Sequence, residues 1–560
     1  MRAHAARVAL VGTLTFTLAS AAPATPSPPS PLLVVVPART TSSTVPSCAL
    51  YHATVGTHSQ SHILSLDHTC LASLDRDTLV DEEQWGANSL AVPFEWPHYA
   101  TADDHSLTTD SDSSELSGLV WLHPTAVDAD PLALPSTTNP QQLAFSAPSS
   151  DHPPRIPHLE PTPVLTLPGA GEGSLVRLSS TSFRTALAQL EYLTSHPSYS
   201  HFALVAVPRT SANDGRFPDV PQKAVDRVKD HLDGLRFSPA ISRVLAGLDE
   251  KLSRQRMEDD VRTLSGEDQR GLREEEKWVS RHSMSEGAPK AAAWLGEKMR
   301  AYSFHCTSHS YLPNFAPMLE CVYENSALGD ERVGAETGYQ RERWAAEEAV
   351  RDGGRRYGKN ETVVLSAHYD SRGSFGYPTA PGADDDASGT ALVLSVAREL
   401  SHSSLRFARK LVLCLFSGEE QGLLSSAWYA RRLAERGEDV VLQLQVDMVG
   451  FRREGEPMQL ARPDVIGLPE AGWIVGNLSE MYVPELVVGY TAACCSDHQS
   501  FVANAFPATW IFERNGPIAD PCYHNSCDLS SRPGYSFEQI AAHAKVALAT
   551  VLEFGGFAYL

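Results

Sequence analysis

Short apolar segments alternate with amphipathic ones along the C-terminal part of the chain, and this alternation restricts the possible folds more than any other feature. The apolar segments have the length and composition of strands, at 362–367, 410–416, 440–446, 486–489 and 508–512. Helical patterns lie at 388–400, 422–436, 472–481, 498–503 and 537–554. Apolar strands separated by helices are typical of a parallel sheet covered on both faces. We therefore predict an α/β fold over 246–560, with three α-β-α layers and a mostly parallel central sheet.

Titratable side chains follow several of these strands. His368 and Asp370 come at the end of the first strand, Glu419 and Glu420 after the second, and Asp447 closes the third. Open parallel sheets bind ligands where strand ends meet loops, so we expect these groups to lie close together. Each has an ordinary explanation on its own, because aspartates often cap helices and paired glutamates are common on surfaces. Chance does not explain why successive strand ends carry them.

The residue types suit a pair of divalent metal ions. Two ions about 3.5–4 Å apart need imidazole and carboxylate ligands, one of which bridges them, and zinc accepts this mixture. A carboxylate that binds no metal must then accept a proton from the attacking water, and another normally orients a ligand histidine. A loop with three aspartates, 384–386, completes the set. The H-x-D pattern also occurs at 231–233, which we interpret as a solvated helix face.

The order of these motifs resembles that of the co-catalytic zinc aminopeptidases of peptidase family M28. The chain contains H-x-D at 368–370, G-A-D-D-D-A-S-G at 382–389, E-E-x-G at 419–422, Asp-Met at 447–448, and a late histidine in Cys-Tyr-His at 522–524. Over about residues 250–560, the resemblance implies an M28-type zinc peptidase domain with two Zn²⁺ ions per chain. The implied metal ligands are His368, Asp385, Glu420, Asp447 and His524.

The resemblance also implies individual roles. His368 and Asp447 would hold one ion, Glu420 and His524 the other, and Asp385 would bridge the two.

Catalytic roles are implied in the same way. Glu419 would act as the general base, and Asp370 would orient a ligand histidine. Tyr523 precedes the late histidine as in the Streptomyces-type branch of the family, which implies that it polarises the developing oxyanion. His498 lies in a Ser-Asp-His stretch that matches a structural segment of the family.

The implied activity is that of an aminopeptidase acting on peptides with a free N-terminus. We expect the apolar residues Met448 and Phe501, near the strand ends, to line a pocket for a hydrophobic first side chain. Three alternatives stay open. The chain would be an M28-type carboxypeptidase, with Arg514 as the candidate carboxylate-binding group, a glutaminyl cyclase, or a catalytically inactive secreted binding protein.

The first 245 residues carry fewer signals. Residues 1–21 have a basic start, a short apolar core and small residues at the end, as in a signal peptide, so we predict a secreted, extracellular protein. Residues 22–245 should contain a small α/β unit with disordered linkers. Its expected elements are a strand at 32–36, a helix at 183–192 and a strand at 202–207. Its open roles are a pro-segment acting within the same chain, a folding chaperone and a linker.

Net charge excludes two classes of partner. The chain of 560 residues carries a formal charge of −22, with 68 acidic and 46 basic residues. Nucleic acid and anionic membranes would repel such a surface, so we expect neither as a partner.

Cysteine usage agrees with an oxidising compartment. The count is nine, so at least one thiol is unpaired. We expect a buried free thiol at Cys414 and disulfides within two pairs, Cys306 with Cys321 and Cys522 with Cys527. The pairing of the others stays open, namely Cys48, Cys70, Cys494 and Cys495. Two sequons, at Asn360 and Asn477, predict a glycoprotein.

Overall fold

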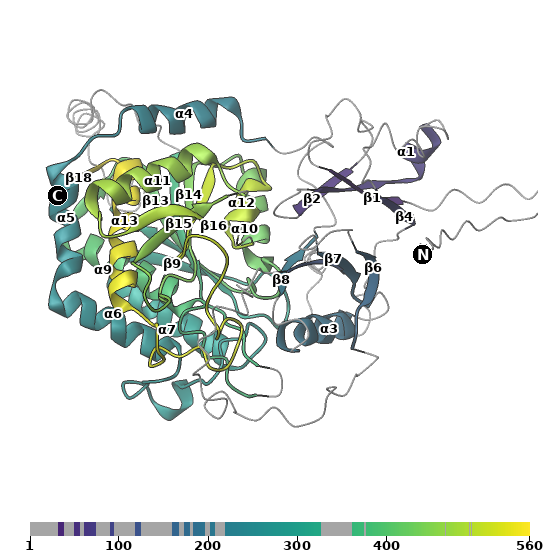
Figure 1. The fold of residues 1–560 in the computed structure, drawn as a ribbon, viewed down its shortest axis with the longest axis horizontal. Helices are drawn as coiled ribbons and strands as arrows, with labels where there is room; N and C mark the ends of the chain where they lie inside the picture. The colour runs from purple at the N-terminus through teal and green to yellow at the C-terminus, as the bar shows by residue number, and fades with distance from the viewer. Residues whose placement is uncertain are drawn as a thin grey trace, which may run out of the picture.

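The computed structural model describes most of the C-terminal part of the chain and shorter segments before it (Figure 1). The described residues are 219–325, 361–374, 377–464, 466–491, 493 and 495–559, preceded by 32–37, 50–55, 61–73, 90–93, 118–124, 159–166, 173–179, 183–196 and 202–207. The predicted signal peptide and the sequon at Asn360 lie outside these residues.

A six-stranded sheet forms the centre of the C-terminal part. Its strands, in spatial order, are β17 (Ala508–Ile511), β14 (Asp439–Val446), β11 (Glu361–His368), β13 (Lys410–Phe416), β10 (Met318–Tyr323) and β9 (Phe304–His309). The first four are parallel to one another, and β10 and β9 add an antiparallel edge. The four parallel strands are buried on both faces, as their continuous apolar sequences require. The predicted α/β fold with a mostly parallel sheet is confirmed.

Helices cover both faces of this sheet. Val363 and Leu365 of β11 belong to one apolar core, whereas Val364 between them belongs to another. The first core contains side chains of α6 (Lys251–Leu264), α7 (Gly287–Ala301), α9 (Ala387–His402), α11 (Pro469–Tyr482) and α13 (Phe537–Gly555). The second contains those of α10 (Leu424–Glu435) and α12 (His498–Val502). Alternate strand residues thus bury two helical layers, which gives the three-layer arrangement.

Two helices N-terminal to residue 246 pack into the first core. They are α4 (Gln222–Asp233) and α5 (Pro239–Leu245), which contribute Val228 and Ile241 among others. The first core therefore includes helices that precede the predicted boundary at residue 246. His231, in the second H-x-D, is only 3% exposed and stacks on Phe554 with ring centroids 4.4 Å apart. Its interpretation as solvated surface is wrong, because α4 turns this residue toward α13.

One predicted strand of the central sheet lies elsewhere. Residues 486–489 contribute to β16 (Val487–Thr491), which pairs in parallel with β15 (Gln459–Pro463) in a separate two-stranded sheet. Val487 and Tyr490 are about half exposed, so this strand does not have the two buried faces of a central strand. The remaining short elements are β12 (Leu405–Phe407), β18 (Phe557–Tyr559), η4 (Ala246–Asp249) and η5 (Glu274–Glu276).

Two small antiparallel sheets precede α4. One has the order β2-β3-β1-β4 and is accompanied by a short helix, α1. The other has the order β6-β7-β5-β8 and, together with α3, is called the N-terminal unit below. The bounds of the first set are β1 (Leu32–Pro37), β2 (Leu50–Val55), β3 (Ser61–Leu66), α1 (His68–Ser73) and β4 (Leu90–Pro93). Those of the second are β5 (Leu119–Pro124), β6 (Thr162–Thr166), β7 (Ser174–Arg177), α3 (Phe183–Ser195) and β8 (Phe202–Ala206). The predicted elements at 32–36, 183–192 and 202–207 correspond to β1, α3 and β8.

Both expected disulfides are present, one between Cys306 and Cys321 and the other between Cys522 and Cys527. Cys414 is a buried free thiol, as predicted. The two further disulfide-bonded cysteines among the described residues are Cys70 and Cys495. Cys48 and Cys494 lie outside the described residues. Within the described part of the chain, no helix has the length and apolar composition needed to cross a membrane.

Candidate metal centre

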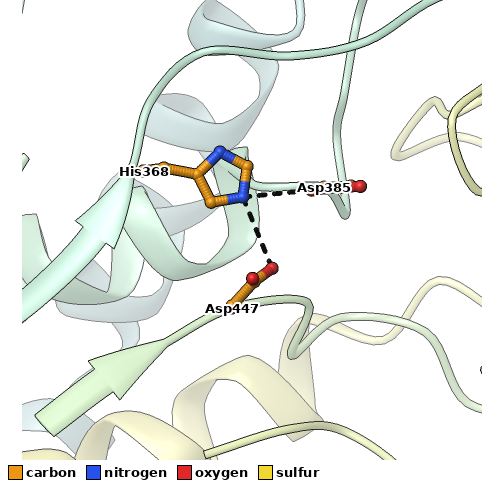
Figure 2. Close-up of side chains that lie close together, drawn as sticks. All are labelled: His368, Asp385 and Asp447. Atoms are coloured by element: carbon orange, nitrogen blue, oxygen red, sulfur yellow. Dashed lines mark ion pairs between the residues drawn. The ribbon is translucent and has the colours of Figure 1, made fainter. Parts of the chain in front are cut away.

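His368, Asp385 and Asp447 converge at the carboxyl edge of the central sheet (Figure 2). His368 is the last residue of β11, Asp447 follows β14, and Asp385 comes from the loop before α9. Nε2 of His368 lies 3.2 Å from one carboxylate oxygen of Asp385 and 3.5 Å from one of Asp447. All three residues are buried. Their side chains form a group that can hold a metal ion.

A second group shares Asp385 with the first and adds Glu420 and His524. Nε2 of His524 lies 3.0 Å from a carboxylate oxygen of Glu420 and 3.4 Å from the other oxygen of Asp385. One oxygen of Asp385 therefore faces His368 and the other faces His524. A carboxylate placed in this way can bridge two ions. The structure thus brings together all the residues that the resemblance implied as ligands.

Both groups contain buried polar atoms that lack a hydrogen-bond partner among the described residues. These atoms include Nε2 of His368, Oε1 of Glu420 and Oδ1 of Asp447. Burying a polar atom without a partner is costly, and coordination of a cation would satisfy it. Zinc accepts imidazole and carboxylate ligands in combination. The residues present therefore fit a pair of zinc ions.

Two carboxyl groups of the centre, those of Asp385 and Glu420, have raised pKa values when no cation is bound. Burial, together with the nearby Glu420, raises the pKa of Asp385 to about 7. Burial also raises the pKa of Glu420 to about 8, although the guanidinium of Arg372 opposes the shift. Divalent cations would remove the repulsion between these groups, so metal binding and ionisation of the carboxylates favour each other.

Glu419 and Glu420 point in different directions, as expected for neighbours at a strand end. Glu420 belongs to the second metal group, whereas Glu419 belongs to neither. Glu419 lines a cavity beside the centre, and its carboxylate lies 3.9 Å from Nε2 of His368. This position, close to the metal ligands but outside both groups, is suitable for a base acting on a metal-activated water.

Asp370 connects the first metal group to the loop between β13 and α10, residues 417–423, which carries Glu419 and Glu420 and is called the glutamate loop below. Its carboxylate oxygens accept hydrogen bonds from the backbone N–H groups of Glu419 and Glu420, at 3.4 Å and 3.3 Å. One of these oxygens also lies 3.5 Å from Nδ1 of His368. The predicted orienting residue is thus placed beside its histidine, and it also holds the loop with the predicted base.

The loop with three aspartates is held by groups that are remote in sequence. The carboxylate of Asp528 accepts hydrogen bonds from the backbone N–H groups of Asp384 and Asp385, at 3.0 Å each. Asp386 caps α9 and also accepts a hydrogen bond from the N–H of Met448, at 3.2 Å. Sequence analysis missed the role of Asp528, because its partners lie more than 140 residues earlier and only the fold brings them together.

Two further side chains contact His524. The ring of Tyr523 stacks on the imidazole, with centroids 3.6 Å apart, and lines the cavity. Burial raises the pKa of Tyr523 well above its ordinary value, so its hydroxyl stays protonated and can donate a hydrogen bond. Arg372 is 2% exposed, and its Nη1 lies 2.9 Å from Nδ1 of His524. No motif distinguishes this arginine in the sequence.

The cavity beside the centre has an apolar wall. Met448 lines it, as predicted, together with Trp510, Phe512 and Ile518, which sequence analysis did not identify. Phe501 does not line it.

The expectation for Phe501 is therefore wrong. The side chain is fully buried and packs against Phe416 and Tyr429, with ring centroids 6.2 Å and 6.3 Å away. It comes from α12, which places it in the core between this helix and the sheet.

The remaining candidates lie outside the metal groups. His498 stacks on Trp510 with ring centroids 5.2 Å apart, and its Nε2 lies 3.1 Å from the carbonyl oxygen of Ile466. These contacts agree with a structural role. Arg514 pairs with Glu456 at 3.0 Å and does not line the cavity. It is therefore poorly placed to bind a substrate carboxylate there.

Known proteins resemble the part of the chain that contains this centre. Residues 350–551 match the model of peptidase family M28. Leucine aminopeptidase 1 of Fusarium vanettenii is 31% identical over 212 residues, which are 35% of this chain and 52% of that protein. Leucine aminopeptidase 1 of Sclerotinia sclerotiorum is 31% identical over 206 residues, covering 35% and 53%. The chain thus spans about half the length of the curated relatives it matches.

A solved structure, LapB from Legionella pneumophila, has a TM-score of 0.49 and 18% identity, covering 70% of this chain and 95% of that one. The family match includes the metal ligands implied by the motifs, from the H-x-D to the late histidine. Residues 350–551, which contain all five of these ligands, are therefore similar to peptidase family M28.

Proposed function

We propose that the chain is a secreted aminopeptidase that removes N-terminal residues, preferably hydrophobic ones, from peptides with two zinc ions as cofactors. The observation that carries the proposal is the pair of metal-binding groups that share Asp385, with Glu419 beside them but in neither. The family match and the curated relatives named leucine aminopeptidase support the class of reaction.

In this proposal His368 and Asp447 would hold one ion and Glu420 and His524 the other, with Asp385 shared by both sets. Zinc bound there would supply a Lewis acid for the attacking water and the scissile carbonyl.

The other residues move protons and fix positions. Glu419 accepts a proton from the attacking water and passes it to the leaving amine. Asp370 keeps His368 and the backbone of Glu419 in place through its two carboxylate oxygens. The hydroxyl of Tyr523 donates a hydrogen bond to the developing oxyanion.

The apolar wall of the cavity supports a preference for a hydrophobic first residue. Met448, Trp510, Phe512 and Ile518 form one apolar cluster, in which no side chain carries a charge. Burying an aliphatic side chain against such a wall contributes about 1.5–3 kcal/mol relative to leaving it in water.

Hydrolysis of leucine p-nitroanilide tests this function. The assay is run with zinc on the intact chain and on the chain cut between β8 and α4, with N-acetyl-leucine p-nitroanilide as the blocked substrate. We expect hydrolysis of the free amine only. Glu419→Gln should keep its zinc and lose turnover by about 10²–10⁴-fold. Glu435→Gln, which changes a 60% exposed carboxylate on α10, is the matched control. Full activity in Glu419→Gln would refute its role as base.

The same panel separates the alternatives. A carboxypeptidase would release C-terminal residues from N-acetylated peptides, and a glutaminyl cyclase would cyclise N-terminal glutamine without hydrolysis. An inactive binding protein would hydrolyse none of the substrates in any form. Each of these results would replace the proposed aminopeptidase reaction.

A further inference from the structure

The edge strand of the N-terminal unit contributes to the wall of the catalytic cavity. Ala203 and Leu204 of β8 line the same cavity as Glu419, Asp447 and His524. Both residues are buried, at 8% and 4% exposure. Figure 1 shows β8 between the rest of the N-terminal unit and the C-terminal part of the chain. The N-terminal unit therefore reaches the candidate metal centre directly.

Arg372 connects the N-terminal unit to the candidate metal centre through hydrogen bonds. It donates hydrogen bonds to the carbonyl oxygens of Leu193 and Phe202, at 2.9 Å each. Its Nε donates to the carbonyl oxygen of Thr194. Leu193 and Thr194 are in the last turn of α3, where carbonyl groups lack helical partners and attract a cation. Since Arg372 also contacts His524, one guanidinium joins the backbone of the N-terminal unit to a candidate metal ligand.

The glutamate loop makes a second attachment. The N–H of Ala206 donates a hydrogen bond to the carbonyl oxygen of Gly422, at 3.0 Å. A Cβ atom on Gly422 would lie 2.7 Å from the backbone nitrogen of Ala206, so the two backbones are in close contact. The next residue, Leu423, is buried in an apolar core that includes Trp121 of β5. This loop also carries Glu419, so the N-terminal unit docks beside the proposed base.

The cavity is narrow with β8 in place. Its free volume is about 20 Å³, which is room for about one or two water molecules. The ligands His368, Asp385 and Asp447 are at most 6% exposed. With Ala203 and Leu204 in its wall, the cavity lacks the room for a peptide terminus and its first side chain.

We propose that the N-terminal unit is an inhibitory plug, an inference that rests on the proposed aminopeptidase function. β8 closes the cavity, and peptides reach Glu419 only after the unit is displaced. Arg372, the carbonyl group of Gly422 and the side chain of Leu423 hold the unit in place. Of the roles left open by the sequence, the pro-segment is the one that explains why Ala203 and Leu204 line a catalytic cavity. A linker or a folding chaperone does not require that position.

The test uses the full, zinc-loaded chain with a recognition site for a sequence-specific protease inserted after Asp219, an exposed residue before α4. Two rates are measured before and after cleavage and gel filtration. One is hydrolysis of leucine p-nitroanilide, and the other is removal of zinc by a chelator, which needs access but no catalysis. Both should rise by about 100-fold, the factor for a cavity that is closed about 99% of the time.

A substitution tests the same contact without cleavage. Leu204→Asp places a carboxylate beside Glu419 and Asp447, so it should loosen β8 and raise both rates in the uncut chain. Glu191→Gln, on the exposed face of α3, is the matched control and should change neither rate.

The outcomes distinguish the plug from the aminopeptidase function on which it rests. Equal rates of zinc removal from the intact and cut chains would refute the plug, whatever their rates of leucine p-nitroanilide hydrolysis. Slow release from the intact chain and fast release from the cut chain, without hydrolysis by either, would support the plug and refute the aminopeptidase.

Discussion

The backbone N–H of Asp385 donates a hydrogen bond to the carboxylate of Asp528, at 3.0 Å and across 143 residues of chain. Asp385 belongs to both metal groups, because one of its carboxylate oxygens faces His368 and the other faces His524. Asp528 is itself held by Arg532, at 2.9 Å. The aspartate loop is therefore positioned by a buried carboxylate that is not itself a member of either metal group.

This contact predicts that Asp528→Asn weakens zinc binding. The amide keeps the shape of the side chain but loses the charge and one acceptor oxygen, so Asp385 should lose its fixed position. Zinc affinity should fall by about 10–100-fold, the usual effect of removing a group that orients a ligand. Competition with a chromogenic chelator measures the change. Asp249→Asn, a 44% exposed surface carboxylate paired with Lys545, is the control. An unchanged affinity in Asp528→Asn would show that the loop holds its position without this contact.

Removing the Cys522–Cys527 disulfide should damage the metal centre more than the fold. The bridge closes a short loop around His524, with a separation of 5 residues, so its loss should cost about 2 kcal/mol of unfolding free energy. Freed from this constraint, His524 should bind zinc more weakly. The Cys306–Cys321 bridge is the matched control, since it spans 15 residues within the β9–β10 hairpin. Its loss should cost about 3 kcal/mol and leave zinc affinity unchanged. Denaturant titration and zinc competition measure both, and equal zinc affinity in the two double-serine variants would contradict this assignment.

Tyr523→Phe should lower turnover while leaving substrate binding nearly unchanged. The substitution keeps the ring that stacks on His524 but removes the hydroxyl that is proposed to stabilise the oxyanion. The loss of one such donor costs about 10²–10³-fold in kcat. Tyr377→Phe, which changes a 48% exposed tyrosine, should have no effect. Steady-state kinetics on leucine p-nitroanilide measure both parameters, and a change in KM alone would argue for a binding role instead.

The metal-free chain should become less stable as the pH rises from about 4 to about 8. Unfolded carboxyl groups lose their protons near pH 4, whereas the pKa of folded Asp385 is about 7 and that of Glu420 about 8. Between these values the folded state binds more protons than the unfolded one, so the free energy of unfolding falls with rising pH. The stabilising contribution is complete below the unfolded pKa and is lost as the pH passes the folded pKa.

Zinc should reverse this trend, because it binds the ionised carboxylates. Its affinity should rise over the same range, about tenfold per pH unit for each proton displaced. Denaturant titrations at several pH values, with chelator and with zinc, measure the effect. A metal-free chain whose stability rises steadily from pH 4 to pH 8 would contradict the pKa shifts.

The sequence was sufficient to predict the four parallel strands of the central sheet and the residues at their carboxyl ends. Apolar strands that alternate with helices leave few arrangements, and parallel strands bring their carboxyl ends together, so His368, Glu420 and Asp447 were predictable as neighbours. His524 follows no strand of the sheet, and only its Cys-Tyr-His context identified it.

Other features depend on tertiary contacts that leave no local pattern. Ala203 and Leu204 look like ordinary residues of a buried strand, and Arg372 like any loop arginine. Their importance arises only where the N-terminal unit meets the catalytic cavity. Phe501 was misplaced for a related reason, because an apolar residue near a strand end packs into the core as readily as it lines a pocket.

The number of zinc ions bound per chain tests the central claim most directly. After saturation with zinc and removal of free metal, elemental analysis should find two ions in the wild type and one in His524→Ala. Asp385→Ala should bind both ions more weakly, since the two metal groups share this carboxylate. A single ion in the wild type, or two ions retained by His524→Ala, would contradict a two-metal centre built from these residues.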